Sequence, residues 1–455
     1  MFMDGQQYAC VAKNLADGYG TWWFPYLSDT WWKAGSGNFM EHPPLVYWLQ
    51  AGFFKVLGDS MYTERIYSFC TAIVTAFLIH KTWKLLFIDR PEIAKMSALP
   101  IILWIIVPVN FWGYQHNIME NTMGVFTLLA VYLFLIGLNK NPVKNYVYLV
   151  LCGISISLAF LSKGPPGLFP LVVIGCYWMA YRNFRIGRML LNSFFLLVVV
   201  MTFFLILTLI PAAYESLGFY VNERLLYRVE HEPTTGNHFS ILLRLFMELL
   251  PALGFVVVSI IVSYTLKLKA DKFLLFQREF LFFLLLGLAG SLPLMLTPVQ
   301  RGFYLNPSWP FWGIALACLA APFLKMIGDK ALKWNKYDMN VKMLGGVMIF
   351  FSIGLTAANA GKARRDGEML TDIHKIVEVV PERSIIVASP DFFDRWNTKF
   401  YLMRYGGISV DIENQRDYYL LDKGVQPYFN NYQKVNIETT LYDLYQRQED
   451  LDQNP

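Results

Sequence analysis

Residues 189–211 read MLLNSFFLLVVVMTFFLILTLIP and contain no acidic or basic side chain. A helix that crosses the hydrocarbon core of a membrane needs about 20 mostly apolar residues. This stretch therefore predicts a membrane-spanning helix rather than a helix buried in a soluble protein. Similar stretches recur along most of the chain, and they decide the fold class.

The composition agrees with a protein that lies in a membrane. Hydrophobic residues make up 55% of the 455 residues, and charged residues make up only 16%, against roughly 25% in a soluble domain. So few charges exclude a disordered chain and a coiled coil. The net charge of +5 is too small to indicate a nucleic-acid binder. The cysteines are odd in number, five, and form no CxxC pair, which argues against a disulfide framework or a zinc site built on thiols.

Ten segments are candidates for membrane spans, so the predicted fold class is an all-α polytopic membrane protein. A helix break at Lys163-Gly164-Pro165-Pro166-Gly167 separates two of them. The segments are 65–88, 97–114, 117–138, 147–162, 165–181, 189–211, 244–266, 278–297, 309–326 and 341–358.

The loops between these segments alternate in charge. One set carries sixteen Lys or Arg residues, whereas the other set carries only Lys163, Arg224, Arg228 and Arg301. Basic loops remain on the cytoplasmic side of a membrane. We therefore predict an inner or plasma membrane protein whose first 64 residues, basic-poor loops and C-terminal tail are extracytoplasmic.

Two further regions are not expected to cross the membrane. Residues 6–16 and 44–57 predict short helices that lie in the membrane interface. The tail has a more polar composition, with a predicted buried strand at 384–389 and either a helix or a strand at 399–405. The sequence thus divides into a membrane domain, residues 1–358, and a small extracytoplasmic α/β domain, residues 359–455.

Ionisable and polar residues gather on the predicted outer face. Such residues at membrane depth are costly and usually functional. The candidates are Asp4, Tyr8, Glu41, His42, Glu120, Lys163, Arg224, Arg228, His231, Arg301 and Tyr304.

Each candidate also has a structural interpretation. Asp4 can cap a helix, and Glu120 can stabilise a helix N-terminus. Lys163 and Arg301 can extend toward lipid headgroups as interface anchors. The two arginines of the largest outer loop can pair with neighbouring glutamates on a solvated helix. The common face of all these residues favours a functional site.

Five short elements occur in a fixed order between residues 4 and 310. They are Asp4-Gly5-Gln6-Gln7-Tyr8, the segment 39–48 with Glu41-His42-Pro43-Pro44, Glu64-Arg65-Ile66-Tyr67-Ser68, Leu161-Ser162-Lys163-Gly164-Pro165, and Gln300-Arg301-Gly302-Phe303-Tyr304-Leu305-Asn306-Pro307. Together they resemble membrane glycosyltransferases with the C-type fold. In particular they resemble the protein O-mannosyltransferase and lipid A aminoarabinose transferase group, glycosyltransferase families 39 and 83.

The resemblance implies transfer of a sugar from a polyprenyl-phosphate donor to an acceptor hydroxyl at the extracytoplasmic face, with inversion. Acceptors in this group are lipids, glycans or proteins. The resemblance makes Asp4 the general base and places Glu120 at the second acidic position of the catalytic set. A lipid phosphate leaves as an anion and needs cations rather than an acid, which Lys163, Arg301 and one of Arg224 or Arg228 would supply.

The remaining candidates of the substrate-binding set are Tyr8, Glu41, His42 and Tyr304. His42 departs from the lysine that is usual in the family. Some relatives hold a divalent metal ion between this glutamate and a histidine of the large outer loop. Glu41 and His231 match those positions, although two ligands do not define a metal site.

Family members have a membrane helix directly before the first-loop aspartate, but only three residues precede Asp4. We therefore expect an eleventh helix and a true start upstream of Met1. A transporter or flippase of a lipid-linked headgroup is the alternative function. A transporter should carry ionisable residues in mid-membrane and an interrupted helix in each of its two halves. The sequence shows only one clear helix interruption. An inactive relative that serves as an assembly partner is a third possibility.

Overall fold

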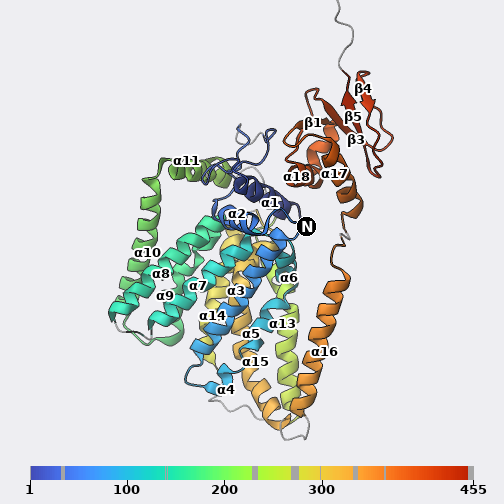
Figure 1. Ribbon diagram of the computed structural model, residues 1–455. Coiled ribbons are helices and arrows are strands. Elements are labelled where there is room, and N and C mark those ends of the chain that lie inside the picture. The colour runs from blue at the N-terminus through green and yellow to red at the C-terminus, as the bar shows by residue number, and fades with distance from the viewer. Residues whose placement is uncertain are drawn as a thin grey trace, which may run out of the picture. The chain divides into compact units, whose positions relative to one another are not determined.

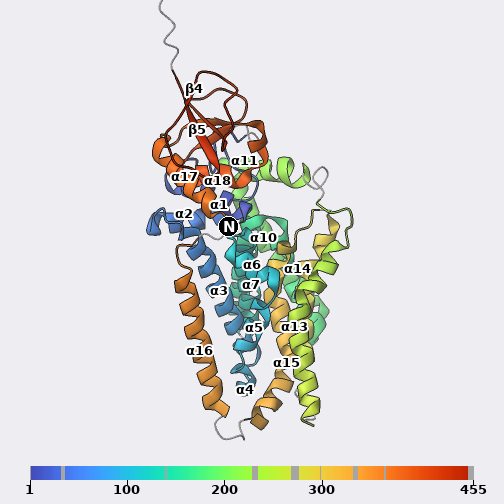
Figure 2. The same ribbon diagram turned by 90° about the vertical axis from the view of Figure 1, so that its right-hand side faces the viewer.

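A computed structural model describes residues 2–31, 36–138, 140, 142–227, 234–267, 276–297, 299–331, 337–362 and 365–448 (Figures 1 and 2). The chain forms two compact units. The helical unit is Met40–Asn335, and the mixed unit combines Met1–Phe39 with Lys336–Pro455. The units thus divide the chain after residues 39 and 335, whereas the division predicted from the sequence lies at residue 358.

The helical unit confirms the membrane fold class. Seven helices among the described residues are long and apolar enough to cross a membrane. They are α3 (Thr63–Leu86), α7 (Met119–Leu138), α8 (Pro142–Lys163), α10 (Ile186–Thr208), α13 (Ser240–Thr265), α14 (Gln277–Ser291) continued by η5 (Leu292–Leu296), and η6 (Gly302–Ser308) continued by α15 (Trp309–Ala331).

The predicted span at 97–114 is bent. It consists of α5 (Ala98–Ile105) and α6 (Pro108–Gln115), which meet at 83°. Pro108 causes the break, because a proline lacks the N–H of a helical hydrogen bond and pushes the preceding residue into an extended conformation. The Glu248 carboxylate accepts the Val109 N–H at 2.8 Å, so a polar group at the break is satisfied inside the bundle.

Shorter elements complete the helical unit. The predicted span at 165–181 is a 3-10 helix followed by a short α-helix, and the predicted interfacial segment at 44–57 is also a short helix. These elements are η2 (Pro165–Val172), α9 (Val173–Tyr181), α2 (Leu45–Leu57), α4 (Pro91–Ala94), α11 (Pro211–Phe219) and the π-helix η3 (Tyr220–Leu226).

Helix α7 lies inside the helical unit. It packs against α3, α8, η2 and η6, and Figure 1 shows it beside α8. Its buried polar residues bond to these neighbours, as in the 2.6 Å contact between the hydroxyls of Thr122 and Tyr67. Polar residues at the start of α7 are therefore held within protein rather than facing lipid.

The mixed unit contains the small sheet that the sequence predicts. Strand β1 coincides with the predicted strand at 384–389, and residues 399–405 form a helix rather than a strand. The elements are α1 (Met3–Ala16), α16 (Tyr337–Ala358), α17 (Gly367–Val379), β1 (Ile385–Ala388), η7 (Pro390–Asp394), α18 (Trp396–Gly406), β2 (Ser409–Asp411), β3 (Tyr418–Asp422), β4 (Tyr432–Lys434) and β5 (Tyr442–Arg447).

The sheet has the strand order β2-β1-β3-β5-β4. Strand β1 runs parallel to β2 and β3, whereas β5 runs antiparallel to β3 and β4. Apolar residues of α17, α18 and the strands form its core, including Ile376, Ile386, Leu402 and Leu420. Parallel strands need a crossover connection, and η7 with α18 connects β1 to β2.

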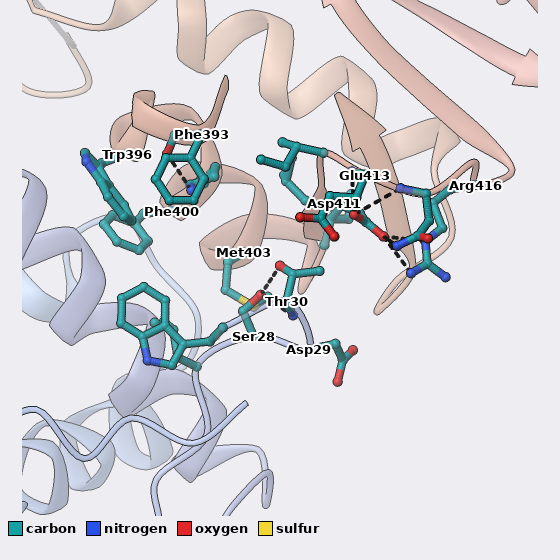
Figure 3. Close-up of a pocket in the computed structure, with 17 residues that line it drawn as sticks. Ser28, Asp29, Thr30, Phe393, Trp396, Phe400, Met403, Asp411, Glu413 and Arg416 are labelled. Atoms are coloured by element: carbon teal, nitrogen blue, oxygen red, sulfur yellow. Dashed lines mark hydrogen bonds and ion pairs between the residues drawn. The ribbon is translucent and has the colours of Figure 1, made fainter. Parts of the chain in front are cut away.

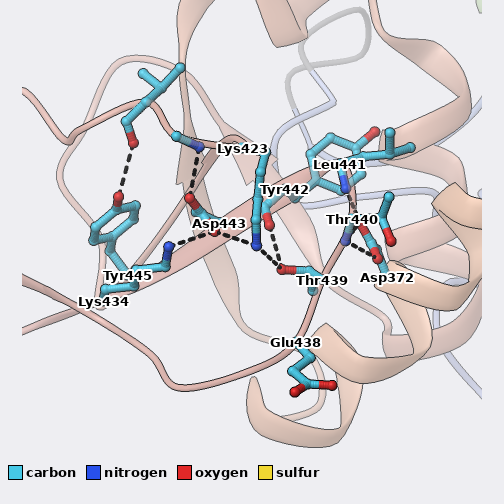
Figure 4. Close-up of polar contacts among 12 residues, drawn as sticks. Asp372, Lys423, Lys434, Glu438, Thr439, Thr440, Leu441, Tyr442, Asp443 and Tyr445 are labelled. Carbon is cyan, nitrogen blue, oxygen red and sulfur yellow. Dashed lines mark hydrogen bonds and ion pairs between the residues drawn. The ribbon is translucent and has the colours of Figure 1, made fainter.

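Two buried aspartates fix the loops of this sheet (Figure 4). Asp372 accepts the backbone N–H groups of Thr440 and Leu441, the latter at 2.6 Å. Asp443 on β5 forms ion pairs with Lys423 at 3.1 Å and Lys434 at 2.9 Å. Buried carboxylates are tolerated when such donors surround them, so these contacts tie β5 to its neighbours.

Helix α1, predicted as an interfacial helix at 6–16, packs against α18 within the mixed unit. The Cys10 thiol lies 3.1 Å from the Phe400 carbonyl. Arg383 donates a 2.9 Å hydrogen bond to the Asn14 side chain, which in turn donates to the Leu27 carbonyl at 3.1 Å. Contacts between residues far apart in the sequence thus join the first 39 residues to the sheet.

Candidate active site

A cavity of about 560 Å³ in the helical unit collects most of the predicted site residues. They come from separate stretches of the chain and meet where α7, α8, η2, η3, η5 and η6 begin or end. The predicted residues that line the cavity are Glu41, His42, Glu120, Lys163, Arg224 and Tyr304.

Lys163 and Glu120 form an ion pair in the wall of this cavity. The Lys163 Nζ lies 2.6 Å from the Glu120 carboxylate, which is 1% exposed. Lys163 ends α8 because Gly164 adopts a φ of +107° and two prolines follow. The lysine thus lies at a helix C-terminus and the glutamate in the first turn of α7, the ends at which the helix dipoles favour these charges.

Aromatic residues hold Lys163 from other directions. Its Nζ lies 5.2 Å from the centre of the Tyr304 ring and 5.6 Å from that of Phe303, distances at which a cation is attracted to an aromatic face. The Tyr220 hydroxyl donates to the Lys163 carbonyl at 3.2 Å. The lysine therefore has a fixed position rather than the freedom of a headgroup anchor.

Arg224 forms the second buried ion pair of the cavity. One guanidinium nitrogen lies 2.6 Å from the Glu41 carboxylate, and the two side chains are 9% and 12% exposed. Arg224 is therefore buried and does not belong to a solvated helix face. Burying such a pair removes two charges from water, so the pair is weak evidence for stability and agrees with a role in binding.

The rest of the cavity wall is mostly apolar. It is formed by η2, by the end of α14, by η5 and by residues that follow η5. Contributing side chains include Leu168, Phe169, Val172, Pro293 and Leu294. A wall that combines two cations, each paired with a carboxylate, with this much apolar surface suits a ligand with a polar head that can replace a carboxylate and a hydrocarbon tail.

Arg301, which the sequence predicts as a cation for the donor phosphate, is not among the residues that line the cavity. Its side chain is exposed, and its backbone is extended at the residue before η6. Tyr304, one turn later in η6, reaches the cavity instead. The neighbouring Gln300 has a structural role, because its side chain bonds Ser240 at 2.7 Å and the His238 carbonyl at 2.8 Å.

Two candidates, Arg228 and His231, lie outside the described residues. The predicted metal pair of Glu41 and His231 is therefore not placed by the structure. Within the described part of the chain, no group of three or more His, Cys, Asp and Glu side chains could hold a metal ion. Glu41 forms an ion pair with Arg224. Metal binding by Glu41 and His231 stays a prediction.

Asp4 and Tyr8 both belong to α1 in the mixed unit. Asp4 lies in the first turn, and Phe2 is the N-cap residue, with no side-chain cap. The interpretation of Asp4 as a helix cap is therefore wrong, although the helix dipole stabilises a carboxylate in this turn. Tyr8 is 2% exposed.

Sequence reasoning missed Tyr220 and the apolar wall. Tyr220 lies in the stretch that the sequence predicts as the largest outer loop, and its contact with Lys163 joins residues 57 positions apart. The wall residues of η2 and η5 looked like ordinary membrane-facing positions, because apolar side chains that face lipid and those that face a cavity have the same composition.

We predict that Gly164→Ala disrupts this site. An added Cβ would lie 2.0 Å from the Tyr220 hydroxyl, and the φ of +107° is unfavourable for any residue with a Cβ. We expect a loss of about 1–3 kcal/mol in the free energy of unfolding, measured by thermal unfolding in detergent. Tyr220→Ala in the same chain should restore part of this loss. Gly175→Ala is the matched control, since its Cβ meets nothing within 4 Å; equal losses in both variants would contradict the prediction.

Comparisons with known proteins by sequence cover part of the chain. Residues 41–211 match a family model described as dolichyl-phosphate-mannose-protein mannosyltransferase. An uncharacterized protein of Aquifex aeolicus is 30% identical over 146 residues, 32% of this chain and 31% of that protein. The undecaprenyl phosphate-alpha-4-amino-4-deoxy-L-arabinose arabinosyl transferase of Wigglesworthia glossinidia brevipalpis is 23% identical over 200 residues, 42% of this chain and 32% of that protein. The matches thus span about a third of each relative.

Solved structures extend the likeness to nearly the whole chain. The crystal structure of ArnT from Cupriavidus metallidurans bound to undecaprenyl phosphate has a TM-score of 0.64 at 14% identity, over 97% of this chain and 93% of that chain. The apo state of the same protein gives 0.62 at 13% identity, over 97% and 92%. The chain has the C-type glycosyltransferase fold.

This C-type fold protein resembles the protein O-mannosyltransferase and aminoarabinose transferase group, as its sequence motifs predict. The family-model match includes Glu41, His42, Glu120 and Lys163 of the cavity. Arg224 and Tyr304 lie beyond it, and the three-dimensional structure adds them to the same wall.

Proposed function

We propose that the protein is a glycosyltransferase that moves a sugar from a polyprenyl-phosphate donor to an acceptor hydroxyl at the extracytoplasmic membrane face, with inversion. The observation that carries this proposal is the cavity that places Lys163 and Arg224 beside an apolar wall. The likeness to a protein whose structure was solved with undecaprenyl phosphate supports the same donor class.

The two cations would stabilise the leaving phosphate. As the bond between the sugar and the phosphate breaks, negative charge grows on the lipid phosphate. Lys163 offers a compact charge, whereas Arg224 offers a planar fork that can hold two phosphate oxygens. Glu120 and Glu41 hold these cations before the donor binds, so the phosphate would replace carboxylate contacts rather than bring a charge into an empty apolar space.

The attacking hydroxyl needs a base, for which we propose Asp4. A positioned carboxylate can accept the hydroxyl proton as the oxygen attacks the anomeric carbon. The support for Asp4 is its place in the first motif of the family resemblance and its position in the first turn of α1. Tyr8, His42 and Tyr304 are proposed to bind substrate, with His42 in place of the family's lysine.

Two assays of the purified protein distinguish transfer of a sugar from transport of a lipid-linked headgroup. The purified protein in lipid nanodiscs would be incubated with a radiolabelled polyprenyl-phosphate sugar and envelope lipids and glycans from cells that lack the protein. We expect label to move to an acceptor, and mass spectrometry would identify the product. Flipping of the donor in vesicles without any transfer of the sugar would overturn the proposal in favour of a flippase.

The proposed orientation can be tested with reporters. Basic loops predict that a fusion after Lys333 reports the cytoplasm, whereas a fusion after Pro455 reports the extracytoplasmic side. Paired alkaline phosphatase and fluorescent protein fusions would measure this in cells. The reverse pattern would put the cavity on the cytoplasmic side and contradict the proposed donor geometry.

A further inference from the structure

A second cavity, of about 590 Å³, lies entirely within the mixed unit (Figure 3). It is lined by residues 27–31, by η7 and α18, and by β2 with the loop that follows it. None of its lining residues belongs to the membrane cavity described above. Its function is therefore a separate question from donor binding.

One wall of this cavity is aromatic. The Trp396 and Phe400 rings stack with centres 6.0 Å apart, and Trp31 meets Trp396 edge-on at 6.3 Å. The Lys399 Nζ lies 4.2 Å from the centre of the Trp396 ring and donates to the Phe393 carbonyl at 2.8 Å. Burial lowers the pKa of Lys399 to about 8. These contacts hold the aromatic groups against one another, with Trp31 and Phe400 buried and Phe393 39% exposed.

The other wall is polar and organised around Asp411. Burial disfavours its charge, but hydrogen bonds from the Glu413 backbone, Asn414 and Arg416 lower the pKa of Asp411 to about 2. The Arg416 guanidinium lies 2.7 Å from this carboxylate. Exposed Glu413 and Asn414 side chains also line the cavity, and Figure 3 shows Asp411, Glu413 and Arg416 together at the side of the cavity away from Trp396.

We propose that this cavity binds a neutral saccharide. A sugar ring has an apolar face of C–H groups and a rim of hydroxyls. The aromatic wall matches that face. The carboxylates can accept hydrogen bonds from the sugar hydroxyls, the guanidinium can donate to them, and the amide can do both. A small number of placed polar groups beside an apolar surface is the usual design of a specific small-molecule site.

Other ligand classes fit this cavity less well. Asp29, Asp411 and Glu413 outnumber Lys399 and Arg416, which disfavours phosphorylated or other anionic ligands. A hydrocarbon chain in the cavity would displace water from the polar wall without replacing the hydrogen bonds, which disfavours a lipid tail. The glycan would be that of the acceptor, and this assignment alone depends on the proposed transferase function.

The test is saturation-transfer NMR on the whole protein in nanodiscs, which avoids detergents with sugar headgroups. The probes are linear tetrasaccharides of mannose, glucose and N-acetylglucosamine. We expect a saturable signal with at least one probe. Trp396→Ala should reduce binding at least fivefold by removing the aromatic face, and Asp29→Asn should weaken it by altering the polar rim. Tyr428→Ala, an aromatic residue that is 86% exposed and outside the cavity, is the control and should change nothing.

The outcomes separate this site from the membrane cavity. No signal with any probe, or a signal insensitive to both Trp396→Ala and Asp29→Asn, would overturn the saccharide site. A signal lost only in Lys163→Met would place the glycan in the membrane cavity and would also overturn it. If binding follows the mixed-unit variants while no sugar transfer is found, the saccharide site stands and the proposed transferase function fails.

Discussion

Lys163→Met is expected to reduce sugar transfer at least about a hundredfold, the scale seen when one group that stabilises a developing anion is removed. Methionine keeps much of the length of the side chain but lacks the charge that would offset the leaving phosphate. The Lys163 Nζ lies beside Glu120 and Tyr304 in the cavity wall. A water molecule that took its place would not supply the lost positive charge. Initial rates of transfer at saturating donor would measure the effect.

The control for Lys163 comes from the basic residue that the structure leaves outside the cavity. Arg301→Ala removes an exposed cation close in sequence to Tyr304 and should leave the rate nearly unchanged. A second variant guards against misfolding, because Lys163→Met alone removes the cation that lies 2.6 Å from the 1% exposed Glu120 carboxylate. Lys163→Met with Glu120→Gln removes both charges and should unfold near the wild-type temperature while still failing to transfer sugar. Equal losses in Lys163→Met and Arg301→Ala would contradict the proposed role.

The sequence predicts the membrane fold because composition and length are local properties. Apolar runs such as 189–211 can do little except span a membrane, and α10 forms at Ile186–Thr208. The break after Lys163 was equally readable, since glycine and proline act on their own backbone. The sequence thus identifies Lys163 and Glu120 as candidates, although it does not show that their charged groups lie 2.6 Å apart.

Pairing over long sequence distances was not predictable in the same way. Arg224 and Glu41 are 183 residues apart, and the sequence offers neighbouring glutamates only as alternative partners for the arginine. In the sequence, Arg301 is equivalent to Lys163 because both flank a predicted span. The point at which η6 begins places Tyr304 rather than Arg301 in the cavity wall, and the sequence does not show that point. The contacts between α1 and α18 likewise join opposite ends of the chain, for which periodicity gives no signal.

In the mixed unit, too, local sequence patterns predict a single strand but not which strands pair. The strand at 384–389 was readable from its short apolar run, but the order β2-β1-β3-β5-β4 was not, because it depends on which strands pair. The saccharide cavity has no motif either. Trp31 and Trp396 are far apart in sequence and meet at 6.3 Å, whereas tryptophans near span ends are usually interpreted as a membrane-interface belt.

Asp4→Asn is expected to lower the transfer rate about 10²–10⁴-fold, the usual contribution of a general base. Asparagine has nearly the same shape but cannot accept the hydroxyl proton, so donor binding should persist while turnover is lost. Native mass spectrometry with undecaprenyl phosphate would measure binding, and single-turnover rates would measure chemistry.

Asp17→Asn is the matched control for Asp4, because it changes the same chemical group at the other end of α1. Asp17 is partly exposed and pairs with Lys13 at 2.8 Å and with Arg383 at 3.4 Å. Exposed ion pairs contribute about 0–1 kcal/mol, so this variant should lose at most a little stability and no transfer rate. If Asp4→Asn turns over like the wild type, the base must be another group, and the first motif of the family resemblance would then mark only the helix that carries it. If instead Asp4→Asn loses donor binding together with turnover, the aspartate acts in binding, and proton transfer has to be assigned elsewhere.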